Sequence, residues 1–148
     1  MIVFISPHTQ RVFNDPDLPS SVSGITRVKS IKILGVTISH NFSMSDHVTA
    51  VITSCAQNLY ALRTLRAHGM PSKELHSVFQ ATVIAKLTYA TPAWWGFVNA
   101  QEKNRLEAFL RRAAKAGFYS AKAAPLFSDL CVSADTRFFA ALCLLISA

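Results

Sequence analysis

Acidic residues are scarce in this chain of 148 residues, and their positions do not form a recognisable catalytic centre. Eight Asp and Glu stand against 15 Lys and Arg, so the formal net charge is +7. The only closely spaced pair is Asp15 and Asp17, which flank Pro16 in a segment with the composition of a turn. Paired carboxylates are ligands for magnesium, but a solvated turn is the expected structure here.

Cysteine is also rare, and the three cysteines are widely spaced at Cys55, Cys131 and Cys143. Without a C-x-x-C pair the sequence indicates neither a zinc site nor a disulfide framework, and a reducing, intracellular setting is expected. The five histidines form no H-E-x-x-H spacing, and there is no G-x-S-x-G motif and no glycine-rich phosphate loop. We therefore predict no catalytic residues, no metal, no cofactor and no small-molecule substrate.

Long hydrophobic runs are missing as well. The apolar start at residues 1–5 is too short for a signal peptide. Residues 138–148 are nearly all apolar but number eleven, against the roughly 20 that a membrane-spanning helix needs. No membrane partner is expected. Hydrophobic residues make up 51% of the chain and charged residues only 16%, which is typical of a piece of a larger protein whose faces meet neighbours.

β-Branched residues concentrate between residues 28 and 38. Ile31 and Ile33, followed past Gly35 by Val36 and Ile38, predict a β-strand with an irregularity at the glycine, and both Ile31 and Ile33 are expected to be buried. A second short strand is predicted over residues 2–5, and residues 14–24 have the composition of a loop.

Helical periodicity dominates after this strand. Apolar residues recur at steps of three and four over residues 45–68, with a cap expected near Ser45, and a second helix is predicted over residues 72–90. Asn99 and Glu102 have the spacing of a capping box that opens a third helix, and a last helix is expected over residues 135–146. The predicted fold class is mainly α. A small β-hairpin element within residues 1–43 precedes a bundle of three to four helices within residues 44–148.

Positive charge is concentrated in the predicted helices. Residues 63–122 contain ten Lys and Arg but only three Glu, which accounts for the whole net charge. Arg105, Arg112 and Lys115 are spaced by seven and three residues and can share one helix face. Such a face suits contact with a phosphate backbone; the alternative is a solvated surface that keeps an apolar chain soluble. The candidate nucleic-acid contacts are Lys32, Arg63, Arg66, Lys86, Arg105, Arg111, Arg112 and Lys115.

Four aromatic residues cluster between the second and third predicted helices: Tyr89, Trp94, Trp95 and Phe97. Aromatic side chains can stack on nucleic-acid bases. A cluster at a turn between two helices more often fills the core, and we expect the core here.

The order of these segments resembles the reverse transcriptases of non-LTR retrotransposons, specifically the jockey-like LINE elements. The resemblance begins with the strand at residues 31–38 and Asp46-His47-Val48 at the start of a long helix. It continues through residues 59–63, His68-Gly69 and residues 83–89, and then through Pro92-Ala93-Trp94-Trp95-Gly96, the helix with Arg111 and Arg112, and residues 127–135. It covers roughly residues 1–140.

The resemblance implies the end of a polymerase palm with a primer-grip hairpin, followed by the thumb that closes over a primer–template duplex. It thereby implies non-specific binding of RNA–DNA or DNA duplex, with the missing palm or a second copy as protein partner. The F/Y-A-D-D motif that holds the catalytic metals of that family is absent from the chain. A non-catalytic, truncated fragment is therefore the expectation.

A second resemblance stays open beside the first. Residues 46–96 are also similar to a short segment attached to AlkB-type alkylation-repair proteins, which are iron- and 2-oxoglutarate-dependent dioxygenases. The H-x-D iron ligands of those enzymes do not occur in this chain. This alternative implies a protein-interaction segment or a non-functional relic without dioxygenase activity.

Overall fold

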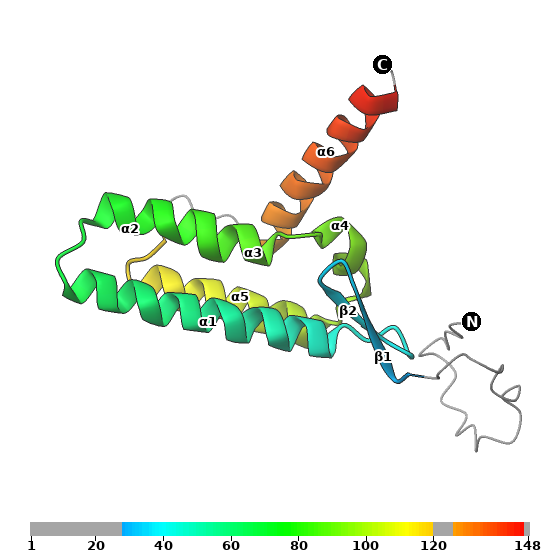
Figure 1. Ribbon diagram of the computed structural model, residues 1–148, viewed down its shortest axis with the longest axis horizontal. Coiled ribbons are helices and arrows are strands. Elements are labelled where there is room, and N and C mark those ends of the chain that lie inside the picture. Colours follow the sequence, from blue (N-terminus) through cyan, green and yellow to red (C-terminus); the bar gives the residue numbers. More distant parts are fainter. Residues whose placement is uncertain (1–27, 120–125, 147–148) are drawn as a thin grey trace, which may run out of the picture.

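A computed structural model describes residues 28–119 and 126–146, which form a small antiparallel hairpin followed by a set of helices (Figure 1). The predicted fold class, mainly helical with a β-hairpin in front, is confirmed. The strand predicted over residues 2–5 and the loop predicted over residues 14–24 lie outside the described residues.

The segment predicted as one strand is two strands. β1 (Ser30–Ile33) and β2 (Val36–Ser39) pair antiparallel with each other. Leu34 and Gly35 form the turn between them, with φ angles of 47° and 87°. Two central residues with positive φ give a turn whose twist matches that of the flanking strands. The single-strand prediction is therefore wrong, because the irregularity expected at Gly35 reverses the chain direction.

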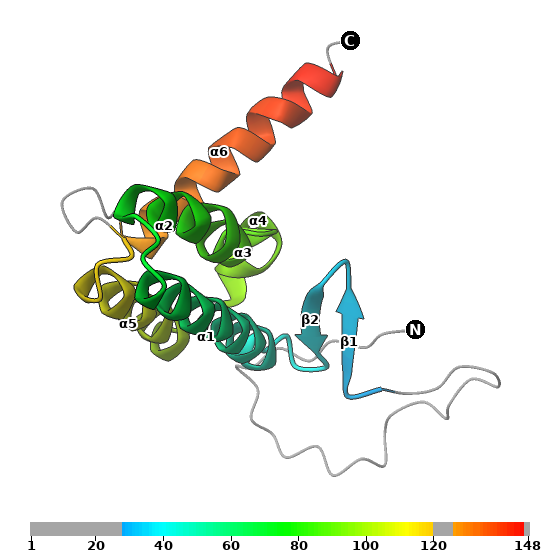
Figure 2. The same cartoon turned by 60° about the vertical axis from the view of Figure 1, so that its left-hand side comes forward.

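The hairpin rests on the helices through β2, and β1 is the outer strand (Figure 2). Val36 on β2 is buried, whereas its cross-strand partner Ile33 is 46% exposed and Ile31 is half-buried. The prediction that Ile31 and Ile33 are buried is wrong, because only the inner strand reaches the helix behind it. That helix is α1 (Ser45–Ala67).

Helix α1 has the predicted bounds, and 23 residues give a rod about 34 Å long. Its buried apolar side chains, Val48, Cys55, Leu59 and Leu62, follow the predicted steps of three and four residues. It ends at Gly69, whose φ of 87° and whose N–H bond to the Arg66 carbonyl oxygen form a left-handed cap. The cap expected at Ser45 is wrong. Met44 precedes the helix, and the Ser45 hydroxyl donates a hydrogen bond to the Glu102 carboxylate instead.

The second predicted helix is a continuous rod of three parts. α2 (Ser72–Phe79) leads into a π-helical turn (Gln80–Ile84), which leads into α3 (Ala85–Leu87). A π turn accommodates one residue more than an α turn. Both Val83 and Ile84 are thereby buried next to each other. The sequence pattern predicted the rod but not the wider turn inside it.

The aromatic segment forms two short turns, α4 (Thr91–Trp94) and the 3-10 turn Trp95–Phe97. α5 (Ala100–Lys115) follows, and its predicted capping box is confirmed. The Glu102 N–H donates to the Asn99 side chain at 2.9 Å, and the Asn99 N–H donates to the Glu102 carboxylate at 3.3 Å.

The last helix, α6 (Phe127–Ile146), begins eight residues before the predicted start at Asp135. Phe127 and Cys131 are fully buried against the bundle and hold the first turns in place. Packing thereby outweighs the modest helix propensity of a segment in which Phe, Ser, Asp, Cys and Val make up six of the eight residues 127–134. No helix in the described ranges combines the length and the apolar composition needed to cross a bilayer.

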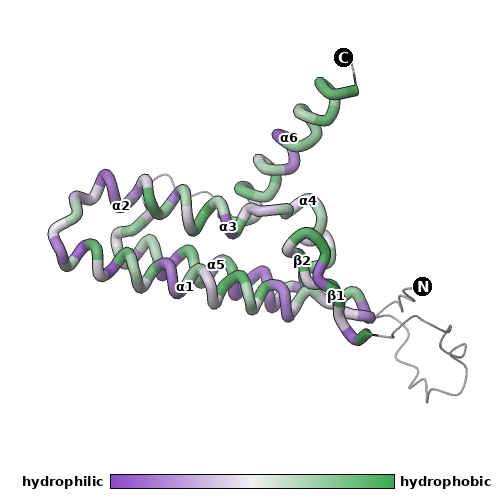
Figure 3. The backbone as a smooth tube through the Cα atoms, in the orientation of Figure 1, coloured by the Kyte–Doolittle hydropathy of each residue, from purple (hydrophilic) through white to green (hydrophobic). Residues whose placement is uncertain are grey.

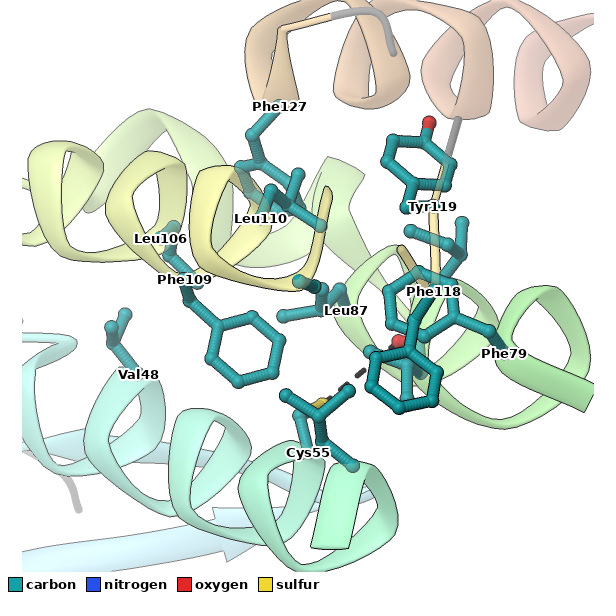
Figure 4. Packing of buried hydrophobic residues seen from close by; sticks show 14 of the residues in the cluster. Val48, Cys55, Phe79, Leu87, Leu106, Phe109, Leu110, Phe118, Tyr119 and Phe127 are labelled. Atoms are coloured by element: carbon teal, nitrogen blue, oxygen red, sulfur yellow. Dashed lines mark hydrogen bonds between the residues drawn. The ribbon is translucent and has the colours of Figure 1, made fainter. Parts of the chain in front are cut away.

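The core lies between α1, the α2–α3 rod and α5, and Figure 4 shows its packing. Cys55 of α1 faces Phe109 of α5 and the rod, and its Sγ lies 3.9 Å from the Val83 carbonyl oxygen. Trp94, Phe79 and Phe118 have no exposed surface. The bundle therefore has one continuous core that positions the outer faces of α1 and α5.

Candidate nucleic-acid interface

Four of the predicted contact residues come together on the outer face of α5. Arg105, Arg111, Arg112 and Lys115 are exposed, and they line one shallow depression of about 450 Å³ together with Ile52 of α1 and Ala108. No acidic side chain of the described residues lines it. We call these four residues the α5 basic face. The opposite face of α5 is buried in the core, so this basic face points to solvent.

Two members of the α5 basic face are held by hydrogen bonds. The Arg105 guanidinium donates to the Thr49 hydroxyl of α1 at 3.1 Å, and Arg112 Nε donates to the Ala108 carbonyl oxygen at 3.2 Å. The side chains of Arg111 and Lys115 make no hydrogen bond or ion pair with any residue that the structure describes. The face thus combines two fixed guanidinium groups with two cations available to an anion.

Arg66 is held by the protein itself. Its guanidinium donates to the Ala116 carbonyl oxygen at 2.6 Å and lies over the Phe118 ring at 4.4 Å from the centroid. These contacts join the end of α1 to the end of α5. Arg63, one turn earlier on α1, is exposed and does not line the depression. Both arginines at the end of α1 are exposed, but only the guanidinium of Arg66 is held by the end of α5.

The two remaining candidates lie on other elements. Lys86 of α3 donates to the Ser54 hydroxyl of α1, so it bridges two helices of the bundle. Lys32 is exposed on the outer strand of the hairpin. Neither lines the depression on α5. The predicted set is thus one cluster of four and four dispersed residues.

The sequence reasoning missed two contributors from α1. Thr49 fixes Arg105, and Ile52 forms the apolar floor of the depression. Their spacing of three residues on one side of the predicted α1 is a signal for a shared face. Which helix that face meets cannot be read from periodicity.

The aromatic cluster divides between core and surface. Trp94 is fully buried and Trp95 is half-buried, as expected for core residues. Tyr89 and Phe97 are more than half exposed, so the core prediction is wrong for these two. The Tyr89 hydroxyl donates to the Leu34 carbonyl oxygen at 3.1 Å and ties this segment to the hairpin turn.

The described residues contain no group of three or more His, Cys, Asp or Glu that could hold a metal ion. Asp15 and Asp17 lie outside these residues. Burial raises the pKa of the Cys55 thiol to about 11 and that of Cys131 to about 12. Both thiols therefore stay protonated near neutral pH, where only a thiolate is a good nucleophile or metal ligand.

His47 is a buried polar residue at the junction between the hairpin and α1. Only 4% of its surface is accessible. Its Nδ1 accepts the Thr37 N–H at 3.4 Å, and its ring packs edge-on against Trp94 with centroids 5.0 Å apart. Burial, and then the charge of Lys32, lower the pKa of His47 below its ordinary value of 6.5.

Acid is expected to destabilise the chain through His47. Because the folded pKa lies below 6.5, the unfolded chain binds the proton first as the pH falls. The free energy of unfolding should be insensitive to this residue above about pH 7. It should decrease below pH 6.5 by at most about 1.4 kcal/mol per pH unit. Urea unfolding at about pH 7.5 and pH 5.5 measures the change. If the free energy of unfolding of a His47→Gln variant decreases equally between these pH values, the decrease comes from other titratable groups.

No protein-family model, curated protein or solved structure matches this chain.

Proposed function

We propose that this chain binds the sugar–phosphate backbone of a nucleic-acid duplex without reading its sequence and without catalysis. The observation that carries the proposal is the α5 basic face, where four cations line one depression and no acidic side chain of the described residues lines it. Arg105 and Lys115 are ten residues apart, which is about 15 Å along the helix. A duplex carries about nine phosphates over that length.

The sequence resemblance supports a specific setting for this binding. The order of segments is similar to that of the palm end and thumb of a non-LTR retrotransposon reverse transcriptase, and a thumb contacts its primer–template through the backbone. We infer a truncated, non-catalytic fragment of such a polymerase. The exposed cations on a helix that packs its other face into a bundle agree with a role of that kind.

Salt dependence tests the type of contact. If the four cations of the α5 basic face each neutralise one phosphate, affinity for a duplex should fall roughly a hundredfold between 50 and 200 mM salt. Fluorescence anisotropy with a labelled RNA–DNA hybrid, and with a DNA duplex of the same sequence, measures this slope. Scrambling the sequence should leave the affinity unchanged. Binding that is insensitive to salt would contradict backbone contact.

Charge reversal tests whether the duplex binds at the α5 basic face. The side chains of Arg111 and Lys115 are exposed and make no hydrogen bond or ion pair with described residues, so R111E with K115E should leave the fold intact. We expect the affinity to fall at least about tenfold, since two contacts become repulsive. The matched control is K29E with K73E, two exposed lysines away from α5 that change the net charge equally. Equal losses in both variants would mean that net charge, and not this face, determines binding.

A further inference from the structure

The outer half of α6 is an apolar helix with no covering structure among the described residues. In Figures 1 and 2 this helix projects away from the bundle, and Figure 3 shows that its last turns are hydrophobic. Six large apolar side chains on it are 40–77% exposed: Phe138, Phe139, Leu142, Leu144, Leu145 and Ile146. Only Arg137 is charged beyond residue 135 of the helix. A solvated helix end normally carries more polar residues than this.

Two rows of apolar residues run along this helix. Cys131, which is buried against the bundle, continues at steps of seven residues as Phe138 and Leu145, so the face that packs onto the bundle extends past it. Beside it, Val132, Phe139 and Ile146 form a second row with the same step. Repeats of seven residues place side chains in the seam between two packed helices.

We propose that two copies of this chain associate through the outer halves of their α6 helices, packed antiparallel. The row of Val132, Phe139 and Ile146 is symmetric about Phe139. A two-fold contact therefore matches this row with itself, placing Val132 opposite Ile146 of the second copy. The row can therefore pair with the same row of a second copy.

The available area suits such a contact. A large aromatic side chain buries about 150–250 Å² in full, so the exposed side chains on or between the two rows offer roughly 100 Å² each: Val132, Phe138, Phe139, Leu142, Leu145 and Ile146. Two helices then bury on the order of 1,200 Å², the lower end of the range for specific interfaces. Leu144 lies on the opposite side of the helix and stays exposed.

Charge selects the antiparallel orientation. Each copy carries a formal net charge of +7, and that excess lies in the segment before α6. Parallel helices would bring two positive bundles together, whereas antiparallel helices place them at opposite ends. Twenty residues of α6 span about 30 Å, which is well beyond the screening length of about 8 Å at physiological salt. Antiparallel packing also places opposite helix dipoles side by side.

Sedimentation of the full-length chain, freed of nucleic acid by nuclease and high salt, tests the association. We expect a dimer at micromolar concentration, and we expect F139E with L142E to raise its dissociation constant at least about tenfold. The matched control is Y60E with L65E, which places the same two charges on an aromatic and a leucine position of α1 that are 72% and 37% exposed, and it should leave the dimer intact. A monomeric wild type, or equal loss in the control, would overturn the proposal.

Disulfide pairing tests the orientation. Two variants, V132C and I146C, are prepared separately in a Cys143→Ala background and oxidised. Neither should crosslink by itself, because the same position in the two copies of an antiparallel pair lies about 21 Å apart. A mixture of the two variants should form the disulfide. Crosslinking of each variant alone would show a parallel pair and overturn the orientation. A monomer with α6 amides protected from hydrogen exchange would instead place another segment of the same chain on this helix.

The proposed dimer and the proposed nucleic-acid binding can be disproved independently of each other. Salt should weaken duplex binding but leave an apolar helix pair intact or strengthen it. R111E with K115E should therefore reduce binding without changing the sedimentation of the free chain. F139E with L142E should weaken the dimer at least about tenfold, while each monomer still binds duplex.

Discussion

Replacing Trp94 by alanine is expected to lower the free energy of unfolding by about 3–5 kcal/mol. Trp94 is fully buried, and its ring lies 5.0 Å from His47 of α1, 6.3 Å from Trp95 and 6.5 Å from Phe127 of α6, between centroids. The substitution therefore opens a cavity where three segments meet. Small domains have a stability of only about 5–15 kcal/mol, so the variant should be close to unfolding. Urea denaturation followed by circular dichroism measures the loss.

Two further variants separate volume from hydrogen bonding at this position. Trp94 Nε1 donates to the Tyr89 carbonyl oxygen at 2.9 Å. Trp94→Phe keeps an aromatic ring but removes this donor, so it should cost less than the alanine variant. Trp95→Ala removes the same side chain from a half-buried position and should also cost less. If the alanine variants of Trp94 and Trp95 lower the free energy of unfolding equally, then Trp94 is not the main contact between the three segments that meet there.

Replacing Glu102 by alanine is expected to destabilise the chain by about 2–3 kcal/mol. Glu102 is 4% exposed, and its carboxylate has two roles: it accepts the Asn99 N–H in the capping box of α5, and it accepts the Ser45 hydroxyl from the first turn of α1. One side chain thereby caps one helix and joins it to another. Its loss leaves the Ser45 hydroxyl without this partner in a half-buried position, and thermal unfolding measures the cost.

The control for this prediction is a substitution of Asn99, the other residue of the capping box. Asn99→Ala removes one accepted N–H but leaves the contact with Ser45, so its cost should be only about 1 kcal/mol. Ser45→Ala combined with Glu102→Ala should cost less than the sum of the two single variants, since they share one hydrogen bond. Strict additivity would contradict a direct link between α1 and α5 through Glu102.

The helices were predictable because their local signals agree with their packing. The apolar stripe of α1 and the capping box at Asn99 and Glu102 each specify a helix without knowledge of its neighbours. The hairpin was misread because Leu34, a residue that rarely takes positive φ, occupies the first turn position. The first turns of α6 were missed because Phe127 and Cys131 hold them by tertiary contacts.

The candidate interface was predictable only in part. The spacing of Arg105, Arg112 and Lys115 places them on one face of α5, and the structure brings them to one depression. Charge and spacing alone cannot show that the guanidinium of Arg66 meets a backbone carbonyl and an aromatic ring. Such partners come from a different helix, and the distance between helices is set by the core.

The π-helical turn at Gln80–Ile84 has a consequence for how the length of the chain can change. Phe79 and Leu87 are both fully buried although they are eight residues apart, because the wider turn absorbs one residue. Deletion of one exposed residue there, such as Ala81, would leave them seven apart, which is the same-face spacing of a regular α-helix. The same deletion in α1 would rotate every later side chain by about 100°. Insertions and deletions between related chains should therefore collect in this turn rather than in α1.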